Sequence, residues 1–169
     1  MTRNRPIRYL QIYLNDHLAG ATAGRSLARR AVRNASTSEI RKPLERLADE
    51  IDMDRQALLD IMRSLGTTSD PIKIALGLVT ERLGRLKFNG HLLQPSPLGQ
   101  LIELETLSLG VEGKISLWRS LRDISAVDDL SKRLDVLIDR GEAQRAELER
   151  LRILACRQTF GQVRATEAR

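Results

Sequence analysis

Residues 40–65, which read IRKPLERLADEIDMDRQALLDIMRSL, decide the fold. Apolar residues recur along this stretch in alternating steps of four and three, at Ile40, Leu44, Leu47, Ile51, Leu58, Ile61 and Leu65. This spacing places them on one face of an α-helix. Asp54 interrupts the pattern and puts a carboxylate in the middle of the apolar face. Gly66 follows the last apolar residue and predicts the end of the helix.

The stretch before it predicts another amphipathic helix, over about residues 7–33. The inward face of that helix carries mainly apolar and small residues, at Ile7, Leu10, Leu14, His17, Leu18, Ala21, Gly24, Ala28 and Ala31. The polar residues 34–38 then form a break, in which Ser36, Thr37 or Ser38 can cap the following helix. Two long helices joined by a short loop are expected to lie antiparallel.

The second half of the chain contains two more long helices. The first, over about residues 97–122, has apolar residues nearly all the way round, which predicts the most buried helix. The last begins near Ser125 or Asp128 and runs to about residue 160. Its inward seam reads Val127, Leu130, Leu134, Leu137, Gly141, Gln144, Leu148, Leu151 and Ala155.

The order of these elements predicts an all-α four-helix bundle. A linker of about thirty residues separates the second long helix from the third, whereas a simple up-and-down bundle has only short loops. A shorter helix is predicted inside the linker, from Pro71 to about Lys87. A long crossover between the second and third long helices accounts for this linker. We expect one domain over residues 1–169, with the basic N-terminus 1–6 and the tail 161–169 frayed.

The composition is that of a helical globular domain, with 41% apolar, 30% charged and 3% aromatic residues. The single cysteine, Cys156, excludes an internal disulfide and a site built from several thiolates. No stretch is apolar enough to span a membrane or to serve as a signal peptide, so we expect a cytoplasmic protein with no membrane partner. The net charge of +6 is concentrated at the start, because residues 1–46 hold ten Lys and Arg against three Asp and Glu.

Two short motifs accompany this layout. Residues 14–19 read LNDHLA, which resembles the Leu-Asn-x-x-Leu stretch in the first helix of bacterioferritins and rubrerythrins. Residues 58–66 read LLDIMRSLG, which is similar to the close of their second helix. The resemblance implies membership of the ferritin-like superfamily, a bundle with one long crossover that commonly holds two iron ions.

The resemblance also implies which positions would hold the iron ligands. The family uses a Glu from each of two helices and a Glu-x-x-His pair from each of the other two, because paired metal ions need bridging carboxylates and imidazoles. Aligned on the two motifs, these positions fall on Ala21 in the first helix and on Glu50 and Met53 or Ile51 and Asp54 in the second. In the last helix the seam positions three apart are Gly141 and Gln144, and the third helix offers Glu105 as its candidate. Both family histidines are missing, so we expect no competent di-iron centre and no cofactor.

Asp54 on the apolar face needs a partner, since an isolated buried carboxylate is costly. One interpretation is a reduced site in which His17, Asp54 and Glu105 hold a single metal ion or a small polar ligand. The other is a buried polar network that fixes helix register, with Arg25, Arg55 or Lys114 as the partner of the carboxylate. Structural networks are the commoner cause of buried charge, so we favour the second interpretation.

Arg25, Arg29 and Arg33 are spaced by four residues and form a basic stripe on the first helix. Such a stripe can contact nucleic-acid phosphates. A solvated helix face is the alternative, and the scarcity of aromatic residues for base stacking favours it.

The leading hypothesis is a ferritin-like bundle without iron chemistry, in a non-catalytic binding or structural role. A non-standard metal site and a nucleic-acid-associated bundle are the alternatives. A homodimer is compatible with this hypothesis, and the sequence names no ligand or other partner.

Overall fold

A computed structural model describes residues 5–67 and 96–161. These residues form four α-helices and no strand, and the helices are α1 (Arg5–Asn34), α2 (Ser38–Ser64), α4 (Pro97–Ile124) and α5 (Asp128–Phe160). Each boundary lies within a few residues of its predicted position, and α1 begins at Arg5, inside the segment expected to be frayed. The short helix predicted over residues 71–87 falls outside the described residues. Among the described helices, none has the length and hydropathy needed to cross a membrane.

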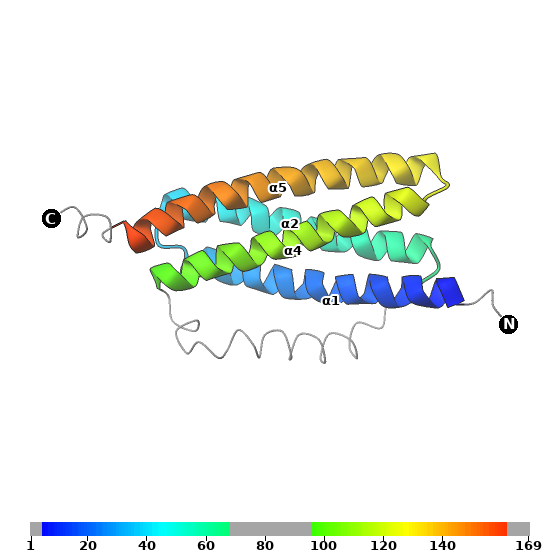
Figure 1. Cartoon of the computed structure of the whole chain (residues 1–169), viewed down its shortest axis with the longest axis horizontal. Helices are drawn as coiled ribbons and strands as arrows, with labels where there is room; N and C mark the ends of the chain where they lie inside the picture. Colours follow the sequence, from blue (N-terminus) through cyan, green and yellow to red (C-terminus); the bar gives the residue numbers. More distant parts are fainter. Residues whose placement is uncertain (1–4, 68–95, 162–169) are drawn as a thin grey trace.

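The four helices form an antiparallel bundle (Figure 1). α1 packs against α2 and α4, and α5 packs against α4 and α2, so each helix has two neighbours. Figure 1 shows α1 and α5 running in one direction and α2 and α4 in the other. The end of α2 and the start of α4 consequently lie at opposite ends of the bundle, and the chain between Ser64 and Pro97 connects these two ends.

The helix ends follow from local chemistry. The Ser96 side chain accepts a hydrogen bond from the Gly99 N–H (3.0 Å), and Pro97 occupies the first turn of α4, where a missing N–H costs nothing. After α2, Gly66 has a positive φ of 65°, a conformation that glycine adopts without strain. The Thr67 N–H then donates to the Met62 carbonyl (3.0 Å) and closes the helix end.

The core consists of two apolar clusters, one in each half of the bundle. The first lies among the end of α1, the start of α2, the start of α4 and the end of α5, and includes Ala31, Leu44, Leu104, Leu148 and Leu151. The second lies at the other end and includes Leu14, Leu58, Ile61, Trp118 and Leu134. Along α2 the first cluster ends at Ile51 and the second begins at Ala57. The interval between them contains Asp54.

Five residues of the predicted apolar faces are exposed instead of inward, and two of them, Leu65 (39% exposed) and Leu98 (44% exposed), lie just after the end of α2 and in the first turn of α4. Ile7 and Val127 are 61% and 60% exposed because they lie at the end of the bundle, where no further turn covers them. Apolar residues lie on every side of α4, so some of them must face outward. Leu109 does so and is 75% exposed. α4 nevertheless has the longest set of buried residues, as its composition predicts.

Candidate functional site

A layer of charged and polar side chains crosses the bundle between the two apolar clusters. We call it the central layer, and it consists of Glu50 and Asp54 of α2, Lys114 of α4, and Arg140 and Gln144 of α5. Asp54, with 1% of its surface exposed, is the carboxylate at its centre. One oxygen of Asp54 accepts from the Lys114 ammonium and from Gln144 Nε2 (3.1 Å), and the other accepts from Arg140.

Gln144 joins the members of the central layer. Its Oε1 accepts a hydrogen bond from Lys114 Nζ, and its Nε2 donates to Glu50 Oε2 (3.0 Å) and to Asp54 Oδ2. Each polar atom of this buried amide therefore has a partner, which fixes the orientation of the amide. Because the bonds connect α2, α4 and α5, they also fix the register of these helices.

Burial and charge act in opposite directions on Lys114. Burial lowers the pKa of this lysine below its usual value, and the nearby Arg140 guanidinium lowers it further. The negative charges of Asp54 and Glu50 oppose this shift. The negative charges of its carboxylate partners thus stabilise the charged form of the Lys114 ammonium against the cost of burial.

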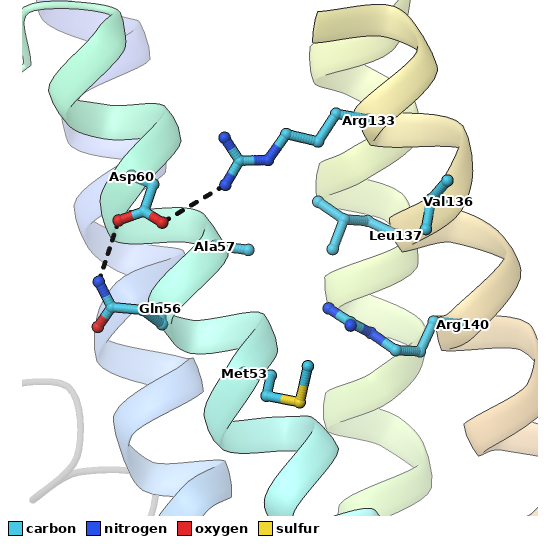
Figure 2. A pocket seen from close by; sticks show the side chains of 8 residues that line it. All are labelled: Met53, Gln56, Ala57, Asp60, Arg133, Val136, Leu137 and Arg140. Carbon is cyan, nitrogen blue, oxygen red and sulfur yellow. Dashed lines mark hydrogen bonds and ion pairs between the residues drawn. The ribbon is translucent and has the colours of Figure 1, made fainter.

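A groove runs beside the central layer, between α2 and α5 (Figure 2). Its volume is about 450 Å³, and its lining residues are Met53, Gln56, Ala57, Asp60, Arg133, Val136, Leu137 and Arg140. Of the helices that neighbour each other, α2 and α5 pack the most loosely. Arg140 therefore contacts two features, because its guanidinium binds Asp54 in the core while its side chain lines the groove.

Asp60 is the carboxylate of the groove wall. It accepts a hydrogen bond from Gln56 (3.0 Å), pairs with Arg63 of its own helix, and faces Arg133 of α5 at 3.5 Å. The Gln56 hydrogen bond and the charges of Arg63 and Arg133 lower the pKa of Asp60. Asp60 is therefore ionised at neutral pH and already has two partners on its own helix.

A second buried carboxylate, Glu103, lies between α1 and α4. Its Oε1 accepts from Arg30 Nε (2.8 Å) and from Asn34 Nδ2 (3.0 Å), while its Oε2 is buried and accepts no hydrogen bond from the described residues. Gln100, one turn before it, accepts from the Ser36 backbone N–H (3.1 Å). These residues were not predicted to be buried, because the apolar residues that surround α4 leave its inward face undefined in the sequence.

The three residues proposed as a metal site do not come together. Asp54 lies in the central layer, Glu105 is exposed on α4, and the half-buried His17 packs its ring edge-on against Tyr13 with 4.6 Å between ring centroids. Within residues 5–67 and 96–161, no three His, Cys, Asp or Glu side chains are grouped so that they could hold a metal ion. The structure thus places Asp54 in a polar network, as the favoured interpretation predicts.

Of the three cations predicted as partners of Asp54, the structure selects Lys114. Arg25 pairs with Asp52 instead (2.8 Å), and Arg55 donates to the Thr22 hydroxyl (3.1 Å). Sequence reasoning missed Arg140. Its position one turn before Gln144 places the two side chains on the same face of α5, and this spacing could have revealed it.

The basic stripe on α1 is partly neutralised. Arg25 and Arg29 both pair with Asp52 of α2, at 2.8 Å and 3.0 Å, and Arg33 is exposed. Arg30, beside the stripe, is engaged with the buried Glu103. Two of the three arginines therefore connect α1 to α2.

The positions at which the family resemblance places iron ligands are occupied by residues that carry no ligand atom or make other contacts. Ala21 is half-buried and carries no ligand atom, and Gln144 belongs to the central layer. Gly141 is buried against α4, where an added Cβ would lie 2.7 Å from Ile115 Cγ1. Glycine at this position thus allows α4 and α5 to approach closely.

Comparison of the chain with protein-family models, with curated proteins and with solved structures gives no match in any of the three. The proposal below therefore depends on the residues and contacts just described.

Proposed function

We propose that the chain is a ferritin-like helical bundle without a competent di-iron centre, which acts through binding or as a structural element and not as a catalyst. The observation that carries this proposal is the pair of cations on Asp54. Lys114 and Arg140 occupy both oxygens of the only fully buried carboxylate that the described residues place between the two apolar clusters.

The layout supports the ferritin-like part of the proposal. The bundle has two antiparallel pairs, α1 with α2 and α4 with α5, and its second and third long helices run in the same direction. A connection along the length of the bundle is what distinguishes ferritin-like folds from up-and-down bundles. The central layer also lies near the middle of the helices, where such bundles place their metal ions.

Charge balance supports the absence of iron chemistry. In a di-iron bundle, several carboxylates compensate the positive charge of two metal ions. In this chain an ammonium and a guanidinium supply the positive charge, and Gln144 supplies a neutral amide where the family pattern would place an imidazole. A metal ion would have to displace both cations from Asp54 and would leave them largely buried without that carboxylate, which is unfavourable.

The alternative functions have less support. The candidates for a single-metal site are separated, because Glu105 is exposed while Asp54 is buried. A nucleic-acid interface on α1 would have to use a stripe in which Arg25 and Arg29 already share an ion pair with Asp52. We therefore retain the non-catalytic bundle as the proposed function.

Elemental analysis of protein purified without chelators tests this proposal. We expect iron, manganese and zinc far below one equivalent per chain, and no acceleration of Fe²⁺ oxidation in air. The variant Asp54→Asn and its exposed control Asp49→Asn should show the same low metal content. Stoichiometric metal in the wild-type protein that is lost in Asp54→Asn and kept in Asp49→Asn would contradict the proposal.

A further inference from the structure

The groove between α2 and α5 combines apolar side chains with cations. Met53 of α2 is 57% exposed and Val136 of α5 is 64% exposed, and both line the groove (Figure 2). Leu137 and Ala57 lie between them at its floor and are buried. Large apolar side chains left exposed on both walls of one groove mark a surface that gains from being covered.

Positive charge exceeds negative charge around this groove. Asp60 meets two arginines, Arg63 and Arg133, and Asp54 beneath the groove meets Arg140 and Lys114. Glu50 is the third carboxylate near this set; it accepts a hydrogen bond from Gln144, and its charge acts on Lys114, so four cations stand against three carboxylates. Arg140 Nε is also buried and donates to no acceptor among the described residues. An anion is therefore the kind of ligand that the electrostatics of the groove favour.

We propose that the groove binds an organic carboxylate with an extended apolar chain. This inference rests on the proposed function, because it specifies the ligand of a binding protein. The carboxylate is held by Arg133, and the apolar chain covers Met53, Val136 and Leu137 in the direction of Arg140. The volume of about 450 Å³ falls within the range of small-molecule sites.

Arg133 is the better of the two arginines for the carboxylate. Its contact with Asp60 is 3.5 Å long, whereas Asp60 has a 3.0 Å hydrogen bond from Gln56 and a close pair with Arg63. Asp60 thus keeps two partners when Arg133 turns to a ligand. Arg140, in contrast, is one of two cations on the buried Asp54, and removing it from that carboxylate would be costly. A guanidinium also matches a carboxylate with two parallel hydrogen bonds.

Both parts of the ligand are needed in this proposal. A small anion such as acetate would satisfy Arg133 but would leave Met53 and Val136 exposed. A neutral chain such as decanol would cover the apolar walls but would leave the excess charge unchanged. A metal cation would be repelled by the arginines that line the groove.

Calorimetric titration of the full chain with decanoate, below its micelle-forming concentration, tests the inference. We expect saturable binding of one decanoate per chain. Decanol lacks the charge-assisted hydrogen bond and acetate lacks the buried apolar chain. Each should therefore bind at least about tenfold more weakly than decanoate. The variant Arg133→Gln should weaken decanoate binding about tenfold or more. Arg145→Gln is the matched control, because Arg145 is an equally exposed arginine of α5 that pairs with Glu112 (3.0 Å) away from the groove.

Equal decanoate affinity in the wild type and Arg133→Gln would overturn the inference, as would equal weakening by Arg145→Gln. Decanol binding as tightly as decanoate would also overturn it, since that result requires apolar contact alone. Metal content measured on the same preparations separates this inference from the proposed function. Absent metal together with absent decanoate binding removes only the ligand assignment, while stoichiometric metal contradicts the proposed function whatever decanoate does.

Discussion

Asp52 and Asp54 are two residues apart on α2, and each is shared by two cationic side chains. Asp52 pairs with Arg25 and Arg29 of α1 on the surface, where 34% of its side chain is exposed. Asp54 pairs with Lys114 and Arg140 in the core, where 1% is exposed. The two sites have the same formal charges and differ mainly in their access to water.

This difference decides what each carboxylate contributes. Water solvates Asp52 and its arginines whether or not they pair, so a surface pair contributes little net free energy. The cations on Asp54 are only 14% and 24% exposed, so loss of the carboxylate leaves two like charges close together with little water to solvate them. The buried site therefore holds three helices in register, and the exposed site adds a salt-sensitive contact between two.

The largest effect is expected for Asp54→Asn. This change keeps the volume of the side chain and removes the charge that balances Lys114 and Arg140. We expect the free energy of unfolding to fall by about 3–5 kcal/mol, the usual cost of breaking a buried ion pair from one side. Urea unfolding followed by circular dichroism measures it, and a loss below about 1 kcal/mol, typical of surface pairs, would show that Asp54 is not buried as described.

A smaller effect is expected for Lys114→Met. Asp54 keeps Arg140 and Gln144 in this variant, and the methionine fills a similar volume without a desolvated charge. We expect a change in the free energy of unfolding within about 1.5 kcal/mol of the wild type, because replacing a buried ion by an apolar residue of similar size is often close to neutral. A loss as large as that of Asp54→Asn would show that the two charges are equally indispensable.

The variant Lys114→Met also tests how the free energy of unfolding depends on pH. The pKa of Lys114 is lowered in the folded protein from a value of 10.5, so the unfolded chain binds more protons in the interval below pH 10.5. The contribution of Lys114 to the free energy of unfolding therefore rises as the pH rises through that interval. The difference in unfolding free energy between wild type and Lys114→Met should shift in favour of the wild type as the pH rises towards 10.5. A shift in the opposite direction would mean that the lysine gains more from Asp54 than burial costs it.

The smallest effect is expected for Asp52→Asn. We expect a loss of about 0–1 kcal/mol at low salt, and a smaller loss once added salt screens the surface charges. Unfolding midpoints measured at low and high salt check this, with Asp54→Asn measured alongside. A loss that does not change with salt would place Asp52 among the buried charges and remove the contrast between the two sites.

Periodicity alone was sufficient to predict the four helices. The steps of three and four from Ile40 to Ile61 gave the inward face of α2 and marked Asp54 as a buried carboxylate, and both predictions are confirmed, whereas Leu65 lies past the helix and is exposed. The seam of α5 likewise identified Gly141 and Gln144 as inward. α4 was harder, because its apolar residues surround the helix. Glu105, the candidate ligand that the family resemblance suggested on this helix, is exposed, whereas Glu103 and Gln100 are buried.

The partners of Asp54 could be predicted only in part. Lys114 was one of three cations considered, and the structure selects it because α4 brings it to the same level as Asp54. Arg140 was missed although its position one turn before Gln144 marks it, and what the sequence does not show is that its side chain also lines a groove between α2 and α5. Spacing along one helix is visible in a sequence, whereas the separation between two helices is not. The resemblance to ferritin-like proteins and the absence of a metal remain predictions.

The division of the core has a practical consequence for following this protein in solution. Trp118, the single tryptophan, lies in one apolar cluster, and Cys156, the single cysteine, packs against the other. The fluorescence of Trp118 and the labelling rate of the Cys156 thiol thus report on opposite halves of the molecule, and no residue has to be introduced for either measurement. If the two signals change together during denaturation, the halves unfold as one cooperative unit; if they separate, the bundle opens from one end.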